Sequence, residues 1–177
     1  MDLDGQLAAL RGAIRDVPDF PKPGIVFKDI TTLLGDEALF RRAVDLMSVM
    51  CGDLAVDKVV AIESRGFILG GALALRLGAG FVPVRKPGKL PWKARRASYQ
   101  LEYGSDSLEI HEDALKPGER ALVVDDVIAT GGTACAVLEL VASLGATVAS
   151  FAFLIELGFL DGRAKLAGSE IRSLIRY

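Results

Sequence analysis

The chain has 177 residues, 51% of them hydrophobic, and its 21 Lys and Arg against 23 Asp and Glu give a formal net charge of −2 at pH 7. This near-neutral balance excludes a protein built to bind nucleic acid as a polymer, and the apolar content excludes intrinsic disorder. The length fits one domain, over residues 1–177, with enough chain to bury a substantial core.

Apolar runs alternate with helical patterns along the chain. Apolar residues at spacings of three and four predict helices over residues 5–16, 37–51, 66–77 and 133–144. Short apolar runs predict buried strands over residues 59–62, 81–84, 121–124 and 148–155, and residues 18–24 form a loop. Pro83 indicates that the second of these strands lies at a sheet edge or is irregular. The order predicts an α/β fold, with a mostly parallel sheet and helices on both of its faces.

Residues 99–111 carry the pattern of a β-hairpin. Apolar and polar residues alternate over 99–103 and again over 108–111, and residues 104–107 are typical of a turn. Because a two-stranded ribbon is only marginally stable alone, we expect this hairpin to be a lid.

No segment has the pattern of a signal peptide or a membrane span. The longest uncharged stretch, 140–155, is shorter than the roughly 18 to 20 residues that a spanning helix needs. Cys51 and Cys135 are too few for a disulfide framework, and we expect both to be packing residues. His111 is the only histidine and is expected on a strand surface. These features predict a cytoplasmic protein that binds no membrane.

Charged residues follow three of the predicted strands. They are Glu63 to Arg65, then Arg85 and Lys86, then the adjacent pair Asp125 and Asp126. Polar residues at the end of a single strand are ordinary. Since ligands bind beyond the carboxyl ends of parallel strands, three such ends with adjacent glycines predict a ligand site at one rim of the sheet.

The segment 122–133 is the most informative part of the sequence. An apolar strand delivers Asp125 and Asp126 to its end, and small residues with a Gly-Gly pair lead directly into a helix. Backbone N–H groups and a helix N-terminus make an anion cradle suited to a phosphate monoester, whereas the carboxylates need sugar hydroxyls or a divalent metal. The alternative is an ordinary capped strand–turn–helix. Neither the Walker A pattern nor the dinucleotide fingerprint occurs.

This segment resembles the phosphoribosyl-pyrophosphate motif of the type I phosphoribosyltransferases, in which a hydrophobic run and two acids precede a Thr-Gly-Gly-Thr loop. Residues 19–30 resemble the base-binding region of the adenine-specific members, and residues 63–67 resemble their pyrophosphate loop. Residues 84–91 and 99–104 resemble their flexible loop. The resemblance runs in order from about Ile14 to about Lys165.

The resemblance implies the family's fold, with an N-terminal hood and base-binding region over 1–35 and a flexible loop and hairpin over 86–112. It implies transfer of phosphoribose from 5-phosphoribosyl-1-pyrophosphate to adenine, which gives AMP and pyrophosphate. It also implies Mg²⁺, held mainly through the substrate rather than in a protein cage, and a homodimer. The alternatives are another purine or orotate phosphoribosyltransferase, or a non-enzymatic sensor of phosphoribosyl pyrophosphate.

The residues divide into groups by their expected roles. The 5′-phosphate would bind to Ala129, Thr130, Gly131, Gly132 and Thr133, and the ribose hydroxyls or magnesium to Asp125 and Asp126. The pyrophosphate would bind to Glu63, Ser64, Arg65, Arg85, Lys86 and Lys89. Adenine would contact Val26, Phe27, Lys28 and Val127.

Two further expectations concern the chemistry and the loop. The resemblance implies that the Val26 carbonyl and the Lys28 N–H read the base and that Arg65 and Glu102 are catalytic, with Glu102 handling a proton at the purine after loop closure. Otherwise Glu102 is a solvated hairpin carboxylate. The basic stretch 85–96 either recruits a polyanionic small molecule or is a solvated loop.

Overall fold

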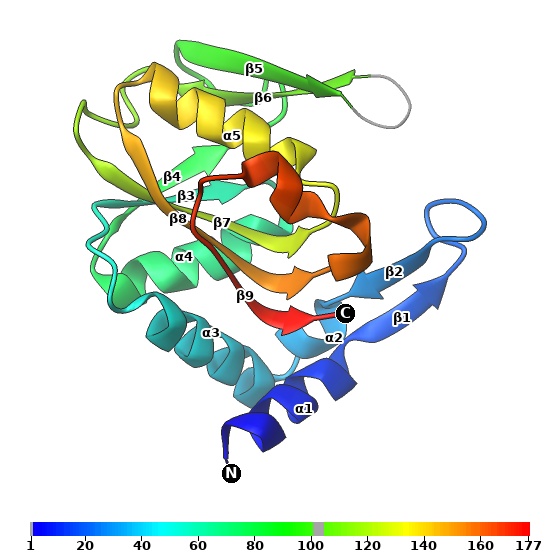
Figure 1. The fold of residues 1–177 in the computed structure, drawn as a ribbon. Helices are drawn as coiled ribbons and strands as arrows, with labels where there is room; N and C mark the ends of the chain where they lie inside the picture. The colour runs from blue at the N-terminus through cyan, green and yellow to red at the C-terminus, as the bar shows by residue number, and fades with distance from the viewer. Residues whose placement is uncertain (1, 101–104) are drawn as a thin grey trace. The chain divides into compact units, whose positions relative to one another are not determined.

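The computed structural model describes residues 2–100 and 105–177 and divides into two compact units, residues 1–46 and 47–177 (Figure 1). The first unit holds two helices and an antiparallel hairpin, followed by the start of a third helix that continues into the second unit. Their bounds are α1 (Leu3–Ala13), β1 (Arg15–Pro18), β2 (Val26–Asp29), α2 (Thr31–Leu34) and α3 (Glu37–Cys51).

The helix predicted over 5–16 is wrong at its C-terminal end. It ends at Ala13, because Arg15 and the next three residues pair with β2, and Arg15 lies opposite Asp29. The Arg15 guanidinium lies 2.6 Å from the Asp29 carboxylate, which has a pKa of about 2, lowered by hydrogen bonds from the Thr31 amide and Arg15. Strand pairing therefore overrides a helical periodicity at this point.

The second unit is built on a five-stranded parallel sheet. Its strands, in spatial order, are β4 (Gly80–Val84), β3 (Lys58–Ile62), β7 (Arg120–Ile128), β8 (Thr147–Glu156) and β9 (Ile171–Arg176). The strand with Pro83 is an edge strand, as predicted, because proline donates no ladder hydrogen bond. The prediction did not include β9, which forms the opposite edge. Two short 3₁₀ helices, η1 (Gly158–Leu160) and η2 (Gly162–Leu166), connect β8 to β9.

Helices cover both faces of this sheet, as predicted (Figure 1). Helix α4 (Arg65–Leu77) packs on the face that carries Val59 and Ala61, where Gly70 lets the helix approach β3 closely. Helix α5 (Gly132–Ser143) packs on the opposite face. The core on that side includes Val60, Ile62, Val84, Val123, Val137, Leu140, Val141, Phe151 and Phe153.

The predicted hairpin exists, but it starts earlier and its predicted turn is wrong. Strand β5 (Ala94–Gln100) pairs with β6 (Ser105–His111), so Ser105 to Ser107 belong to a strand. The prediction failed because serines occupy paired positions, where the hydroxyls of Ser98 and Ser107 lie 2.8 Å apart. Leu108 and Ile110 are buried in the α5-side core, so this part of the ribbon packs as a layer of that core. The expected role of the hairpin as a lid stays a prediction.

The cysteines pack as expected, whereas the Nε2 atom of His111 is buried without a hydrogen-bond partner among the described residues. Cys51 is fully buried, and burial raises the pKa of its thiol to about 11, which makes it a poor nucleophile. Cys135 is half-buried and, like Cys51, is a free thiol. His111 is half-buried on β6. Among the described residues, no helix combines the length and apolar character needed to cross a bilayer.

Two adjacent glycines of α4 allow a matched test of this packing. A methyl group on Gly70 would lie 2.5 Å from the Ala61 Cβ, whereas one on Gly71 would meet no atom within 4 Å. We expect Gly70→Ala to destabilise the protein by about 1–3 kcal/mol through overpacking. Gly71→Ala should be neutral or stabilise by up to about 1 kcal/mol, because alanine favours helix. Urea unfolding of both variants measures the difference; equal midpoints would contradict this account of the α4–sheet contact.

Candidate active site

The site lies where the direction of the chain around the sheet reverses. The chain leaves β3 through α4 to reach β4 on one side, and it leaves β7 through α5 to reach β8 on the other side. Since β3 and β7 are neighbours, their carboxyl ends diverge into helices on opposite faces and leave a crevice between them. Both strands end in the residues that the sequence singled out.

A pocket of about 350 Å³ occupies this crevice. Its wall consists of residues 62–65 after β3, Lys86 after β4, Tyr99, Asp106 and Leu108 of the hairpin, residues 125–134, and Phe153. The structure therefore brings together, in one pocket, the predicted acidic pair, the predicted phosphate loop, Val127, and the segment from Glu63 to Arg65.

Asp125 and Asp126 lie inside β7, not after its end as predicted, since the strand extends to Ile128 and pairs with β8 over that length. The Asp126 side chain is buried, and its backbone N–H donates to Asp125 Oδ1 at 2.9 Å. Burial, and then the charge of Asp126, raise the pKa of Asp125 well above its ordinary value. Burial also raises the pKa of Asp126, although Arg65 opposes that shift.

The start of α4 is built against this acidic pair. A methyl group on Gly66 would lie 2.9 Å from Asp125 Oδ1 and 3.0 Å from the Val124 carbonyl oxygen, so only glycine fits there. This close approach places the Arg65 guanidinium 3.0 Å from Asp126 Oδ2. That oxygen is buried and accepts no hydrogen bond of good geometry from the described residues, so the positive charge of Arg65 is what compensates it.

The loop from Ala129 to Thr133 has the geometry of an anion cradle. Gly131 has φ +77°, which favours glycine, and it is the N-cap of α5, where no described side chain accepts a capping hydrogen bond. The first amides of a helix have no partner within the helix, and the dipole adds positive potential. The amides and the hydroxyls of Thr130 and Thr133 can therefore hold a phosphate.

Tyr99 is a pocket residue that the sequence analysis did not assign to the site. It reaches from β5 to hydrogen-bond the Thr133 side chain, and its hydroxyl lies 3.4 Å from Asp106 Oδ2. Burial is the main cause of its raised pKa. Tyr99 takes part in the apolar–polar alternation of the hairpin, which predicts that its side chain lies on the apolar face. Alternation does not show which other element that face packs against, so it could not place Tyr99 in the pocket.

The predicted pyrophosphate residues form an ion-pair cluster. Lys89 Nζ lies 2.6 Å from Glu63 Oε1, while Arg85 Nε and the Lys86 backbone N–H each donate to Oε2 at 3.1 Å. Burial raises the pKa of Glu63, but these hydrogen bonds outweigh it and the net shift is downward. Arg85 and Lys89 are not among the residues of the pocket wall, whereas Lys86 is, and its ammonium pairs with Asp106 at 3.1 Å.

The predicted adenine contacts lie in different parts of the chain. Val127 is in the pocket wall. Val26, Phe27 and Lys28 belong to β2 of the first unit, where the Phe27 ring packs edge-on against Phe20 at 5.2 Å, and Lys28 Nζ lies 2.6 Å from Asp16. Glu102 lies outside the described residues.

No group of three or more His, Cys, Asp or Glu side chains that could enclose a metal occurs in residues 2–100 and 105–177. The carboxylates of Asp125 and Asp126 are nevertheless hard oxygen donors in a pocket with room for a polyanion. Mg²⁺ prefers one or two carboxylates combined with substrate phosphates and water, so the donor set fits Mg²⁺ that arrives with a phosphorylated substrate.

Comparison with known proteins decides the family. Residues 36–169 match the phosphoribosyl transferase domain family. Adenine phosphoribosyltransferases from Geobacter metallireducens and Geotalea uraniireducens are 57% and 55% identical to the chain over 168 residues, which cover 95% of it and 98% of each relative. The chain belongs to the adenine phosphoribosyltransferase family.

Solved structures of adenine phosphoribosyltransferases share its fold. The enzyme from Thermoanaerobacter pseudethanolicus aligns with a TM-score of 0.95 at 52% identity, covering 97% of this chain and 99% of that one. The enzyme from Saccharomyces cerevisiae, complexed with an imino-altritol bisphosphate and adenine, aligns with a TM-score of 0.92 at 40% identity, with the same coverage. The predicted family and the predicted fold are thus confirmed.

The raised pKa of Asp125 leads to a stability prediction. A carboxyl whose pKa is higher in the folded state loses stabilisation as pH rises above its unfolded value, near 3.8, so ionised Asp125 destabilises the fold at pH 7. Asp125→Asn keeps an oxygen for the Asp126 amide and removes the charge. We expect its Tm at pH 7 to exceed that of the wild type by a few degrees, and the gain to shrink toward pH 4.

Thermal unfolding at several pH values measures this difference. Asp113→Asn, at an exposed position, is the matched control and should leave Tm unchanged at all of them. A lower Tm for Asp125→Asn than for the wild type at pH 7 would contradict the raised pKa.

Proposed function

We propose that the protein transfers phosphoribose from 5-phosphoribosyl-1-pyrophosphate to adenine, releasing AMP and pyrophosphate in purine salvage. The observation that carries this proposal is the Asp125–Asp126 pair, of which Asp126 is buried and Asp125 half-buried, beside the cradle of 129–133 in one switch-point pocket. The cradle complements a phosphate monoester and the carboxylates complement a diol, so together the two subsites fit a sugar phosphate.

The ribose 5-phosphate half of the substrate would lie along the β7–α5 connection. The amides of 129–133 and the Thr130 and Thr133 hydroxyls would hold the 5′-phosphate, while Asp125 and Asp126 accept hydrogen bonds from the 2′ and 3′ hydroxyls. Breaking the anomeric bond develops oxocarbenium charge on the ribose, as in glycoside cleavage. Two carboxylates in a poorly solvated pocket would stabilise that charge.

The pyrophosphate leaving group would lie toward the end of β3. Arg65 and Lys86 line the pocket and are its proposed cationic contacts, together with the Ser64 hydroxyl. Arg85 and Lys89 are tied to Glu63, so we propose that they act there as a cluster that neutralises Glu63 and fixes the backbone of Lys86. Mg²⁺, when bound, would neutralise phosphate charge on the substrate.

Adenine selection requires groups that read its amino group and N1. Shape alone separates flat purines poorly, whereas a buried polar contact left unpaired penalises the wrong base strongly. We propose that the Val26 carbonyl accepts from the amino group, that the Lys28 N–H donates to N1, and that Phe27 and Val127 contact the ring faces. The adenine bound to the yeast relative, at 40% identity, supports this choice of base.

The proposed enzyme works as a homodimer in the cytoplasm. Apolar side chains of α4 and β4 remain exposed in the second unit, with Leu75 86%, Ile68 45% and Phe81 42% exposed. Large exposed apolar side chains gathered on neighbouring elements favour a protein interface. The free thiols Cys51 and Cys135 agree with a reducing compartment.

One assay tests the activity against its rivals. Purified protein is incubated with phosphoribosyl pyrophosphate, Mg²⁺ and each of adenine, hypoxanthine, guanine, xanthine and orotate. We expect AMP from adenine as the strongly preferred product. A preference for another base would identify a sister enzyme, and binding of phosphoribosyl pyrophosphate without turnover would identify a sensor.

Glu102 allows a sharper test of mechanism. If Glu102 handles a proton at the purine, Glu102→Ala should lower kcat by roughly 10²–10⁴-fold, the usual range for a general acid or base, with the Tm unchanged. Glu112→Ala removes an exposed carboxylate just beyond the same hairpin and should leave kcat unchanged. Unchanged turnover in Glu102→Ala would remove this residue from the mechanism.

A further inference from the structure

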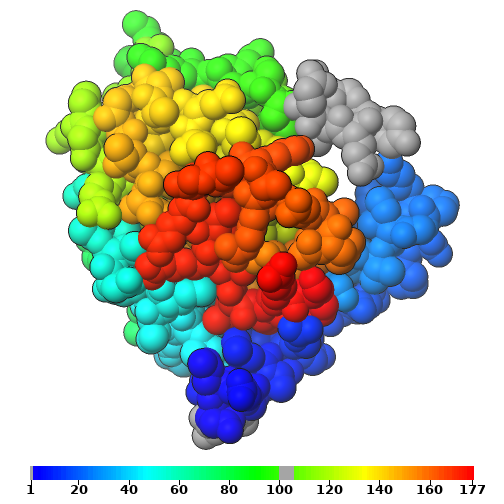
Figure 2. Space-filling view, viewed as in Figure 1, coloured from blue at the N-terminus to red at the C-terminus, as the bar shows by residue number. Residues whose placement is uncertain are grey.

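The 3₁₀ helix η2 lies against the phosphate loop. A methyl group on Gly162 would lie 2.2 Å from the Ala129 carbonyl oxygen and 3.0 Å from the Gly131 amide nitrogen. Reciprocally, a methyl group on Gly131 would lie 2.3 Å from the Gly162 carbonyl oxygen. Two backbones therefore meet with no side chain between them. The space-filling view shows the orange-red residues of η2 lying directly against the yellow residues of α5 (Figure 2).

Gly131 and Gly162 are constrained for different reasons. Gly131 has φ +77°, so glycine is favoured there by conformation as well as by space. The backbone of Gly162 is outside that left-handed region, so alanine is excluded at 162 by space alone, chiefly by the Ala129 carbonyl oxygen of the loop and also by Ile128 Cγ1 at 3.0 Å. A substitution at Gly162 consequently acts on the loop and leaves the local backbone preference of η2 unstrained.

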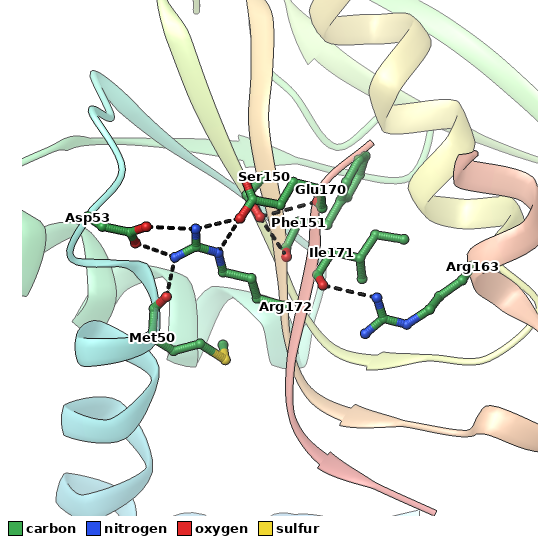
Figure 3. Close-up of polar contacts among 8 residues, drawn as sticks. All are labelled: Met50, Asp53, Ser150, Phe151, Arg163, Glu170, Ile171 and Arg172. Atoms are coloured by element: carbon green, nitrogen blue, oxygen red, sulfur yellow. Dashed lines mark hydrogen bonds and ion pairs between the residues drawn. The ribbon is translucent and has the colours of Figure 1, made fainter. Parts of the chain in front are cut away.

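An ion pair fixes the position of η2. Arg163 donates from Nε and Nη2 to the two carboxylate oxygens of Glu156 at 2.8 and 2.7 Å, and from Nη2 to Ser173 Oγ at 3.1 Å. Its Nη1 donates to the Ile171 carbonyl at 3.0 Å, the contact drawn in Figure 3. Arg163 thus binds Glu156 through two hydrogen bonds and two further groups of β9. Because a guanidinium presents its donors in a rigid plane, these bonds restrict Arg163, and with it η2, to one position.

Glu156 connects this ion pair to the carboxyl end of the sheet, where the phosphate loop begins. It is the last residue of β8, its side chain is buried, and its register partner on β7 is Ile128, the residue before Ala129. The Leu157 N–H donates to the Ile128 carbonyl at 3.0 Å. The backbone of β8 therefore holds the start of the loop, and the backbone of Gly162 packs against Ala129 and Gly131. The buried Glu156 carboxylate connects these two contacts, because it belongs to β8 and binds Arg163, the residue after Gly162.

We propose that Gly162 is a positioning residue for 5′-phosphate binding, and that the Arg163–Glu156 ion pair holds it against the loop. This inference rests on the proposed function of the 129–133 cradle. Amides bind an anion well only when their N–H vectors converge, and a shift of a few tenths of an ångström in Ala129 or Gly131 spoils that convergence. The backbone of Gly162 packs directly against Ala129 and Gly131 and so prevents such a shift.

Gly162→Ala tests the proposal with a readout that a purely structural role would not move. We expect the Kd for ribose 5-phosphate and the KM for phosphoribosyl pyrophosphate to rise at least tenfold, and the KM for adenine to stay within twofold of the wild type. Gly12→Ala, in α1, is the matched control, because its added methyl meets no atom within 4 Å, and it should change none of these constants. A folded Gly162→Ala protein with wild-type affinity for ribose 5-phosphate overturns the proposal.

Arg163→Lys keeps the proposal testable if the alanine at 162 prevents folding. Lysine keeps the positive charge beside Glu156 but loses the bidentate pair and the bond to the Ile171 carbonyl. We expect its Kd for ribose 5-phosphate to rise three- to tenfold, with the KM for adenine unchanged. An unchanged Kd in this variant would show that the ion pair does not position the loop.

Binding of ribose 5-phosphate separates this inference from the proposed function, since it needs no turnover. A wild-type protein that forms no AMP from adenine refutes the proposed function, whatever the variants do. A wild-type protein that forms AMP, with both variants binding ribose 5-phosphate normally, refutes only the role of Gly162.

Discussion

The close approach of backbone to backbone around the end of β7 is the constraint on which the site depends. Gly66 brings the start of α4 against Asp125 on one face, and Gly162 brings η2 against Gly131 at the other end of the β7–α5 connection. In both places a single methyl group would overlap a backbone or carboxylate oxygen. The segment 125–133 is therefore clamped between elements that come from distant parts of the second unit.

This clamping explains how the protein tolerates two adjacent buried carboxylates. A buried charge is costly unless it has partners, and burial raises the pKa of both Asp125 and Asp126. Arg65 compensates one oxygen of Asp126, and it reaches that position because Gly66 allows α4 to start there. Stability is thus given up locally. In the proposed function, a sugar or a metal that binds these carboxylates would recover part of it.

The layers of the second unit could be predicted from the sequence because strand and helix periodicities there agree with burial. The four predicted apolar runs, the edge position of Pro83 and the end of α4 at Leu77 all follow from local chemistry. The hairpin register could not, because Ser105 to Ser107 are turn-like residues in a strand whose pairing is set by Leu108 and Ile110 in the core.

The same distinction applies to the site. The acidic pair and the Thr-Gly-Gly-Thr loop carry a local pattern, and both line the pocket, as expected. Tyr99, Asp106 and Gly162 belong to the site's surroundings through contacts made across the fold. Nothing in the spacing of residues along the chain reports such contacts, so only the folded structure could identify them.

The ion pairs around the pocket differ in how readily a substrate could replace them. Lys86 is 55% exposed and Asp106 26%, and an exposed pair of this kind contributes only about 0–1 kcal/mol, so Lys86 can exchange its partner for a phosphate at little cost. Arg65 and Asp126 are 28% and 5% exposed, and breaking that pair would strand a buried carboxylate. For the proposed reaction, we therefore expect Arg65 to meet pyrophosphate while still paired with Asp126, and Lys86 to exchange Asp106 for a phosphate of the substrate. A chain with a net charge of −2 can in this way present positive charge to a polyanion, because the exposed Lys86 ammonium is paired only with the half-buried carboxylate of Asp106.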